Sequence, residues 1–226
     1  MSGPSDRTDD ESATRLDAAI EAFAAGDPVL IHDAADREGE VDLVYPAGAV
    51  DPRDVARLRS DAGGLICVAL TDRVAAAFDL PFLADAVDHP ATENHELSYD
   101  DRSSFSLTVN HRDTETGITD RDRARTITAL AAAAADPDGV DFGETFRSPG
   151  HVHLLRGAAA GVADRTGHTE LALALADAAG LPPAVVVCEM LDADSGEAKT
   201  PADARAYADR EGLMYVEGRA IVDRLG

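Results

Sequence analysis

Residues 165–191 read RTGHTELALALADAAGLPPAVVVCEML. The spacing of apolar residues over Thr169–Ala179 predicts a helix, and Gly180 is a typical residue for ending it. The next apolar run, Pro183–Cys188, has the length of a strand and contains no polar position, which is typical of a strand buried on both faces. The stretch therefore predicts a helix followed by a fully buried strand.

The remaining chain contains further helices and strands. Apolar spacing predicts helices at 11–25, 52–61, 72–78, 120–135, 201–210 and 217–225. Short apolar or alternating runs predict strands at 28–31, 41–45, 65–70, 105–110, 152–155 and 213–216. A long polar loop is predicted at 81–101, and loops of this length inside compact domains often have a function.

These elements do not follow a strict strand–helix–strand alternation, and no internal repeat or linker divides the chain. We therefore expect one domain over residues 11–226, preceded by a mobile acidic tail at 1–10. The mixture of elements predicts an α+β or mixed α/β fold.

The composition is strongly acidic. Asp and Glu total 43 and Lys and Arg total 20, so the net charge at pH 7 is −23. Hydrophobic residues make up 45%, enough for a sizeable core, so the acidity does not indicate disorder. Lys199 is the only lysine, and acidic residues are spread along the whole chain. This pattern predicts a protein adapted to high salt, where repulsion between charges is screened.

The same composition excludes several classes of protein. The negative charge opposes binding to nucleic-acid phosphates and to anionic membrane surfaces. No apolar run is long enough to cross a bilayer, and the polar N-terminus lacks the pattern of a signal peptide, so we expect a cytoplasmic protein. The two cysteines, Cys67 and Cys188, lie in apolar runs and are interpreted first as buried thiols rather than as a disulfide framework.

The densest charge cluster is Asp36–Asp42, which reads DREGEVD between two predicted strands. Carboxylates this close together repel one another unless a cation is present, and oxygen ligands suit Mg²⁺. A solvated acidic turn is the alternative. The presence of Arg37 inside the cluster and of apolar strands beside it favours a functional site.

A second cluster, Arg165–Glu170, lies at the start of the helix predicted from Thr169. Backbone N–H groups at a helix N-terminus bind phosphate, Gly167 allows a close approach, and Arg165 can pair with a phosphate oxygen. His168 offers a neutral imidazole to a metal. A capped helix start with an incidental histidine is the alternative.

Three smaller features could also carry chemistry. His151 and His153 lie on one face of a predicted strand, either as a transition-metal pair or as one site histidine and one surface histidine. Glu189 ends the apolar strand, where a partly buried carboxyl group can exchange protons near neutral pH and an exposed one would be incidental. Thr116 precedes the helix at 120–135 and can offer its hydroxyl to a phosphate.

Taken in order, several stretches resemble the 3,4-dihydroxy-2-butanone 4-phosphate synthase family of riboflavin biosynthesis. They are DREGEVDLVYPA (36–47), GGLICVAL (63–70), TGITDRDRARTI (116–127), SPGHVHLLRG (148–157) and RTGHTELALALADAAGLPPAVVVCEML (165–191). The matches cover most of residues 26–222, and long co-linear motifs with several charged residues rarely arise by chance.

The resemblance implies a lyase that converts D-ribulose 5-phosphate into L-3,4-dihydroxy-2-butanone 4-phosphate and formate. The implied route runs through a metal-stabilised enediolate and a skeletal rearrangement, with Mg²⁺ or Mn²⁺, two ions per site, and no organic cofactor. The implied fold is a mixed α/β sandwich with a mixed sheet flanked by helices. The implied assembly is a homodimer with sites near the subunit interface.

The resemblance also assigns roles to residues. The metal ligands match Glu38 and His168. The substrate-binding positions match Arg37, Glu38, Asp42, Thr116, Arg165, Thr166, Gly167, His168, Thr169 and Glu189. Essential residues match His151 and Glu189, which we expect to transfer protons. Glu40 and Cys67 are further catalytic candidates; Glu40 and Asp42 would orient substrate hydroxyls, and packing is the alternative role for Cys67.

Two positions depart from the family pattern. Val41 stands where glycine is common, and Ser148 stands where an arginine usually precedes the proline, so Arg147 is a candidate substitute. Two other functions remain open. One is a different metal-dependent lyase or isomerase acting on sugar phosphates on the same scaffold. The other is an acidic binding module for a basic partner, which the even spread of carboxylates disfavours.

Overall fold

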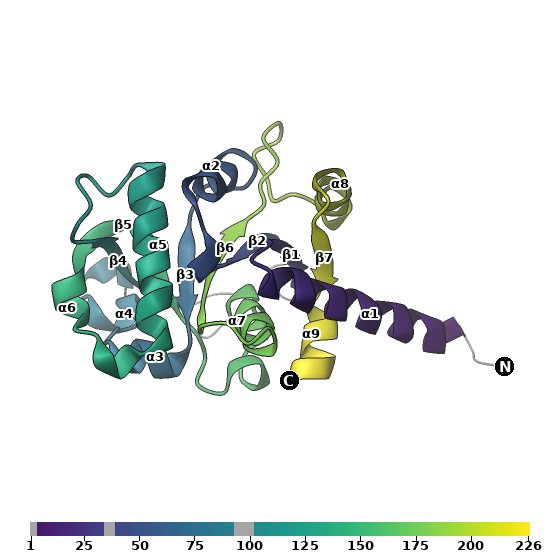
Figure 1. Ribbon diagram of the computed structural model, residues 1–226, viewed down its shortest axis with the longest axis horizontal. Helices are drawn as coiled ribbons and strands as arrows, with labels where there is room; N and C mark the ends of the chain where they lie inside the picture. Colours follow the sequence, from purple (N-terminus) through teal and green to yellow (C-terminus); the bar gives the residue numbers. More distant parts are fainter. Residues whose placement is uncertain (1–3, 34–38, 93–101) are drawn as a thin grey trace.

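A mixed β-sheet forms the centre of the computed structural model, which describes residues 4–33, 39–92 and 102–226 (Figure 1). The strands are β1 (Val29–His32), β2 (Val41–Pro46), β3 (Cys67–Leu70), β4 (Phe105–His111), β5 (Phe146–Arg156), β6 (Ala184–Glu189) and β7 (Met214–Glu217). The helices are α1 (Pro4–Ala24), α2 (Pro52–Ser60), α3 (Asp72–Ala77), α4 (Leu83–Ala86), α5 (Asp120–Ala135), α6 (Phe142–Thr145), α7 (His168–Ala178), α8 (Pro201–Glu211) and α9 (Gly218–Leu225).

The strand order in this seven-stranded sheet is β4-β5-β3-β6-β2-β1-β7. Strand β6 lies in the middle and pairs antiparallel with both β2 and β3. The pairs β1–β7 and β3–β5 are parallel, so the sheet is mixed. All residues of β6 are buried except Glu189, which is partly exposed, so the predicted doubly buried strand is confirmed.

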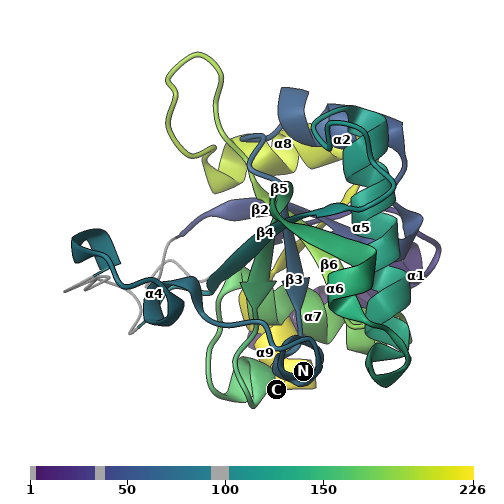
Figure 2. The same ribbon diagram turned by 90° about the vertical axis from the view of Figure 1, so that its left-hand side faces the viewer.

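Side chains that alternate along the strands build two cores, one on each face of the sheet. In β1, Leu30 points into a core covered by α2, α5 and α8, whereas Val29 and Ile31 point into a core covered by α1, α7 and α9. Figure 2 shows α2 and α8 on one side of the sheet and α7 and α9 on the other. The predicted single domain, in which helices flank a mixed sheet, is therefore confirmed.

Most predicted elements lie within a few residues of the observed ones, and α5 has the predicted bounds. The prediction is wrong in four places. Helix α1 begins at Pro4 rather than at residue 11, and whether residues 1–10 are mobile remains a prediction. The predicted loop at 81–101 contains α4 and a 3-10 turn at Pro90–Thr92, and its remainder, 93–101, lies outside the described residues.

The other two differences concern β5 and α6. Strand β5 begins at Phe146 rather than at residue 152, because the chain continues in extended form through the Pro and Gly of residues 149–150. The short helix α6 was not predicted, since four residues are too few to show a helical period. Within the part of the chain that the structure describes, no helix combines the length and the apolarity needed to cross a bilayer.

Candidate active site

A cavity of about 430 Å³ opens beside the middle strands and the first turn of α7. Its lining includes many of the predicted site residues, namely Glu40, Asp42, Cys67, Arg165, His168, Thr169 and Glu189. The remaining wall consists of Gly63, Leu65, Ser103, Ser104, Phe105, Leu155, Val187 and Leu191. Residues from six separate stretches of the sequence thus meet at one place.

Strand register brings two carboxylates, those of Asp42 and Glu189, together. Asp42 of β2 is the direct partner of Glu189 of β6, and Cys67 of β3 is the partner of Val187, also in β6. Directly paired residues project from the same face of a sheet. Asp42, Glu189 and Cys67 therefore lie on the face covered by α7, although they are far apart in the sequence.

His168, the first residue of α7, contacts the Asp42 carboxylate from the helix that covers this face of the sheet. Its Nδ1 atom lies 3.3 Å from Oδ2 of Asp42, and the Asp42 side chain is only 3% exposed. A carboxylate on one ring nitrogen fixes the orientation of an imidazole and leaves the other nitrogen to face a metal ion. The pair supports a ligand role for His168 and a positioning role for Asp42.

Arg165 supplies the positive charge of the cavity wall. Its Nη1 atom is 2.7 Å from Oε2 of Glu170, whose side chain is fully buried. Thr169 is also buried, at 1% exposure, and lies in the first turn of α7. A helix N-terminus beside an arginine is a favourable environment for a phosphate group.

Cys67 lies in the wall of the cavity with its side chain largely buried. Burial raises the pKa of the Cys67 thiol far above its ordinary value, and the Asp42 carboxylate adds to this shift. The thiol is therefore neutral near pH 7, and it can act as a packing group or weak donor but not as a base.

His151 and Thr116, two further predicted site residues, do not line this cavity. His151 is exposed and belongs to a bulge of β5, between the pairs Asn110–Arg147 and Val109–Val152. Its backbone N–H donates to Oδ1 of Asn110 at 2.8 Å. The bulge turns His151 out of the regular ladder, as bulges near functional sites commonly do.

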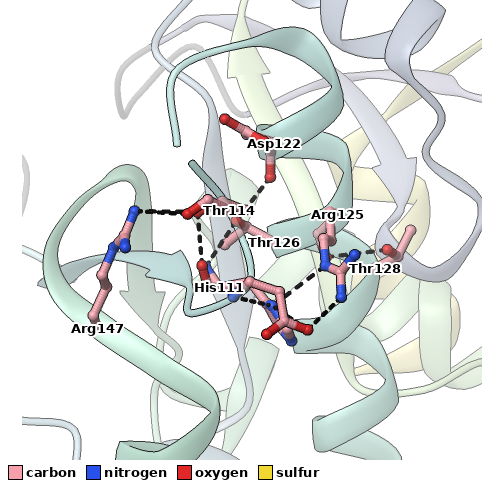
Figure 3. Close-up of polar contacts among 8 residues, drawn as sticks. His111, Thr114, Asp122, Arg125, Thr126, Thr128 and Arg147 are labelled. Atoms are coloured by element: carbon pink, nitrogen blue, oxygen red, sulfur yellow. Dashed lines mark hydrogen bonds and ion pairs between the residues drawn. The ribbon is translucent and has the colours of Figure 1, made fainter. Parts of the chain in front are cut away.

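Thr116 lies in the turn between β4 and α5, which a network of polar contacts anchors (Figure 3). Thr114 donates its hydroxyl to the carbonyl of His111 at 2.7 Å, and Nη2 of Arg147 donates to the carbonyls of Thr114 and Glu115. Arg147, the candidate substitute for a family arginine, thus holds this turn in place. Thr116 itself is exposed and donates to Asp122 at 3.4 Å.

Gly117, in the same turn, packs against Asn110, the residue that accepts the hydrogen bond from His151. It has a φ of +85°, and a Cβ atom there would lie 2.0 Å from Nδ2 of Asn110. Only glycine fits both the conformation and the contact. The turn that carries Thr116 therefore packs directly on the asparagine that holds His151.

The other predicted site residues are placed as follows. Thr166 and Gly167 directly precede α7, between the lining residues Arg165 and His168. Arg37 and Glu38 lie outside the described residues. Sequence reasoning did not identify the serines at 103 and 104 or Phe105, although they follow the predicted long loop. Glu170 belongs to a quoted motif, but no role was predicted for it.

The donor set of the cavity suits a hard divalent cation. Glu40, Asp42 and Glu189 contribute carboxylates, and His168 contributes an imidazole. Among the described residues, no three His, Cys, Asp or Glu side chains are grouped closely enough to hold a metal by themselves. Carboxylate oxygens beside an imidazole fit Mg²⁺, which is commonly bound by one or two protein groups together with waters and substrate oxygens.

Comparisons with known proteins give a consistent result. A family model described as 3,4-dihydroxy-2-butanone 4-phosphate synthase matches residues 17–224. The protein named 3,4-dihydroxy-2-butanone 4-phosphate synthase from Archaeoglobus fulgidus is 47% identical over 216 residues, covering 90% of this chain and 91% of the relative. Its namesake from Methanosarcina mazei is 46% identical and covers 94% of this chain and 91% of the relative.

Solved structures show the same similarity. The crystal structure of the synthase of Candida albicans matches with a TM-score of 0.78 at 27% identity, covering 93% of this chain and 97% of that one. A synthase structure in complex with two magnesium ions matches with a TM-score of 0.73 at 32% identity, covering 91% of this chain and 94% of that one.

Proposed function

The chain belongs to the 3,4-dihydroxy-2-butanone 4-phosphate synthase family, and on this premise we propose that it converts D-ribulose 5-phosphate into L-3,4-dihydroxy-2-butanone 4-phosphate and formate. The observation that carries the proposal is the convergence of Asp42, His168, Glu189 and Arg165 on one cavity. The first three have side chains that can coordinate a metal ion or transfer a proton, and Arg165 can bind a phosphate group.

The phosphate end of the substrate lies at the start of α7 in this proposal. Arg165 offers a guanidinium that matches the geometry of phosphate oxygens, and it lies beside the N-terminus of α7, which is the end of a helix that favours an anion. Thr169 adds a hydroxyl group from that turn. Arg165 thus places a positive charge beside the proposed phosphate site, although the net charge of the whole chain is −23.

In this proposal the metal ions bind where β2 begins and β6 ends. We assign His168 as a metal ligand together with Glu38, which the family resemblance indicates, and Asp42 holds the His168 ring. A similar solved structure is in complex with two magnesium ions, which supports a role for Mg²⁺. Two ions per site, and Mn²⁺ as an alternative metal, are further parts of our proposal. When bound, the cations supply Lewis acidity that lowers the pKa of the proton beside the substrate carbonyl.

Glu189 is placed to take that proton. It ends the buried strand β6, lines the cavity and is the direct partner of Asp42 in the sheet. Removal of the proton gives the enediolate, and the following skeletal shift and formate release need further proton transfers. Glu40 and Asp42 orient the substrate hydroxyls. We assign no base role to Cys67, because its thiol is neutral near pH 7.

The positions of His151 and Thr116 support the proposed homodimer. Both are exposed, and neither lines the cavity of its own chain. We propose that they act on the substrate from a second copy of the chain whose surface covers the cavity. Sites near the subunit interface satisfy this requirement. We propose in addition that the acidic composition is an adaptation to high salt; the cytoplasmic location expected from the sequence remains a prediction.

The test is an assay for formate released from D-ribulose 5-phosphate in multimolar KCl. We expect release with Mg²⁺, loss of release with EDTA, and recovery when Mg²⁺ is restored. Glu189→Gln should lower kcat at least about 100-fold, the lower range for loss of an acid–base group. Glu197→Gln, which changes an exposed glutamate in the loop after β6, is the matched control.

Two results would contradict the proposal. Absence of formate from a protein that circular dichroism shows to be folded excludes the reaction. Turnover of other pentose or hexose phosphates in its place would favour a different sugar-phosphate lyase or isomerase on the same scaffold.

A further inference from the structure

We propose that Glu170 and Gly167 together fix the guanidinium of Arg165 in the cavity wall, which makes Glu170 a positioning residue for recognition of the substrate phosphate. The inference rests on the proposed function, because that function assigns the phosphate to Arg165. It adds two requirements to that function. The buried Glu170 carboxylate must bind the guanidinium, and residue 167 must have no side chain, so that the guanidinium has room.

Glu170 holds Arg165 from the protein interior. The Glu170 side chain is fully buried, and both of its carboxylate oxygens are engaged. Oε1 accepts the backbone N–H of Ala158 at 2.9 Å, and Oε2 lies 2.7 Å from Nη1 of Arg165. The bond to Ala158 prevents the carboxylate from rotating, so the position of Oε2 is set by the backbone and, through it, the position of the guanidinium.

Gly167 holds the space in which the guanidinium lies. Its φ of −79° and ψ of 166° are accessible to any residue, so the backbone conformation does not require glycine here. A Cβ atom at this position would lie 2.6 Å from Nη1 and 2.9 Å from Cζ of Arg165. The arginine head group therefore lies where a side chain of residue 167 would be, and the glycine is required for the place of Arg165.

The surroundings explain why Arg165 needs to be held. Besides the candidate active site, Arg165 lines a second cavity of about 470 Å³, whose wall also includes Arg156 and Asp164. Arg165 thus borders two cavities, and a long arginine side chain has many rotamers that would point away from the proposed substrate site. Glu170 and Gly167 remove this freedom before the substrate arrives, which favours binding.

The experiment compares two variants that affect the charge differently. Glu170→Gln keeps the shape and an oxygen for the N–H of Ala158 but cannot accept a bond from Arg165, whereas Gly167→Ala changes no charge and only displaces the guanidinium. For both variants we expect about a tenfold rise in KM for D-ribulose 5-phosphate, with kcat changed by less than about threefold, the size of one charge-assisted hydrogen bond. Gly48→Ala is the control, because its Cβ would meet no atom closer than 3.8 Å.

A second measurement does not depend on turnover. Titration calorimetry with D-ribulose 5-phosphate in EDTA should show about a tenfold weaker Kd for both variants, with the Gly48→Ala control unchanged. If the wild-type protein binds this compound but releases no formate, the proposed function fails while the positioning of Arg165 is still tested by these Kd values.

Three outcomes would overturn the inference. A tighter Kd for Glu170→Gln would mean that the carboxylate weakens the arginine charge rather than positioning it. Wild-type KM and Kd for Gly167→Ala would mean that the position of the guanidinium does not matter. A purely structural role for Glu170 would lower the melting temperature and kcat without raising KM. Should Glu170→Gln not fold, Gly167→Ala decides alone.

Discussion

Cys67 and Cys188 show how a residue's surroundings limit its chemistry. Both are free and buried, and they belong to the cores on opposite faces of the sheet. Burial raises the pKa of Cys188 to about 12 and that of Cys67 still further. Neither sulfur is a thiolate in the neutral range, in contrast to a free cysteine with a pKa of about 8.5.

We therefore predict that the native protein resists alkylation. Treated with iodoacetamide at pH 8, it should show less than about a tenth of the labelling seen after denaturation in guanidinium chloride, as measured by intact-protein mass spectrometry. Because the raised pKa values lie well above 9, raising the pH from 8 to 9 should add little labelling. The Cys188→Ala variant isolates Cys67, and fast labelling of that variant at pH 8 would show a reactive thiolate in the cavity.

For single residues, the sequence predicts which side chains belong to the candidate site better than it predicts the contacts between them. The resemblance pointed to Asp42, His168 and Arg165, and the cavity contains all three. It could not show that Asp42 contacts His168, because that contact depends on strand register and helix placement. The role of Glu170 was equally hidden, since a lone glutamate in the first turn of a helix is also common as a dipole partner.

Elements were predictable where a continuous apolar run or an apolar period extends over enough residues. The apolar run of β6 and the 16-residue helix α5 are examples. Prediction failed where that signal is absent. The first part of α1 is polar throughout, so no apolar spacing marks its beginning at Pro4. In β5, Pro149 and Gly150 indicate a break, but the chain forms a bulge and continues as a strand.

That bulge and the turn before α5 lead to a prediction about the assembly. If His151 acts in the site of a second copy, mixing two inactive variants should restore activity. A His151→Ala chain and a Glu189→Gln chain, unfolded and refolded together, would form mixed dimers with one intact site. Random assembly should recover about a quarter of the wild-type formate release, because half of the dimers are mixed and each has one of two sites intact.

The controls follow from the same reasoning. Each variant refolded alone should remain inactive, and light scattering should give the mass of a dimer for both. A folded mixture without recovered activity would show that His151 acts in its own chain or not at all.

On the scale of the whole molecule, the charge of −23 and the chemistry of the site must be considered separately. The proposed substrate carries a phosphate, which an acidic surface repels at low ionic strength. Many of the arginines are paired with carboxylates at the surface, as Arg59 is with Asp120 and Arg224 with Asp17. Such exposed pairs contribute little stability individually, so on our proposal of salt adaptation it is salt that relieves the repulsion among the excess carboxylates.

We accordingly predict a strong dependence on salt. Between 0.1 M and 3 M KCl the melting temperature should rise by at least about 10 °C, because the Debye length falls from about 10 Å to below 3 Å. Formate release should rise in the same range. Glycerol at equal viscosity is the control, since it does not screen charge. Equal folding and activity at both KCl concentrations would refute the salt adaptation.

The central place of β6 also has a consequence for how the chain is made. In the sheet, β6 separates β4-β5-β3 from β2-β1-β7, and its residues are synthesised after those of β1 to β5. Until β6 emerges from the ribosome, β2 and β3 lack the partner they share, and unpaired apolar edges favour aggregation. The strand that joins the two halves of the sheet also brings Glu189 beside Asp42. A growing chain that still lacks β6 therefore lacks both a complete sheet and the proposed proton acceptor.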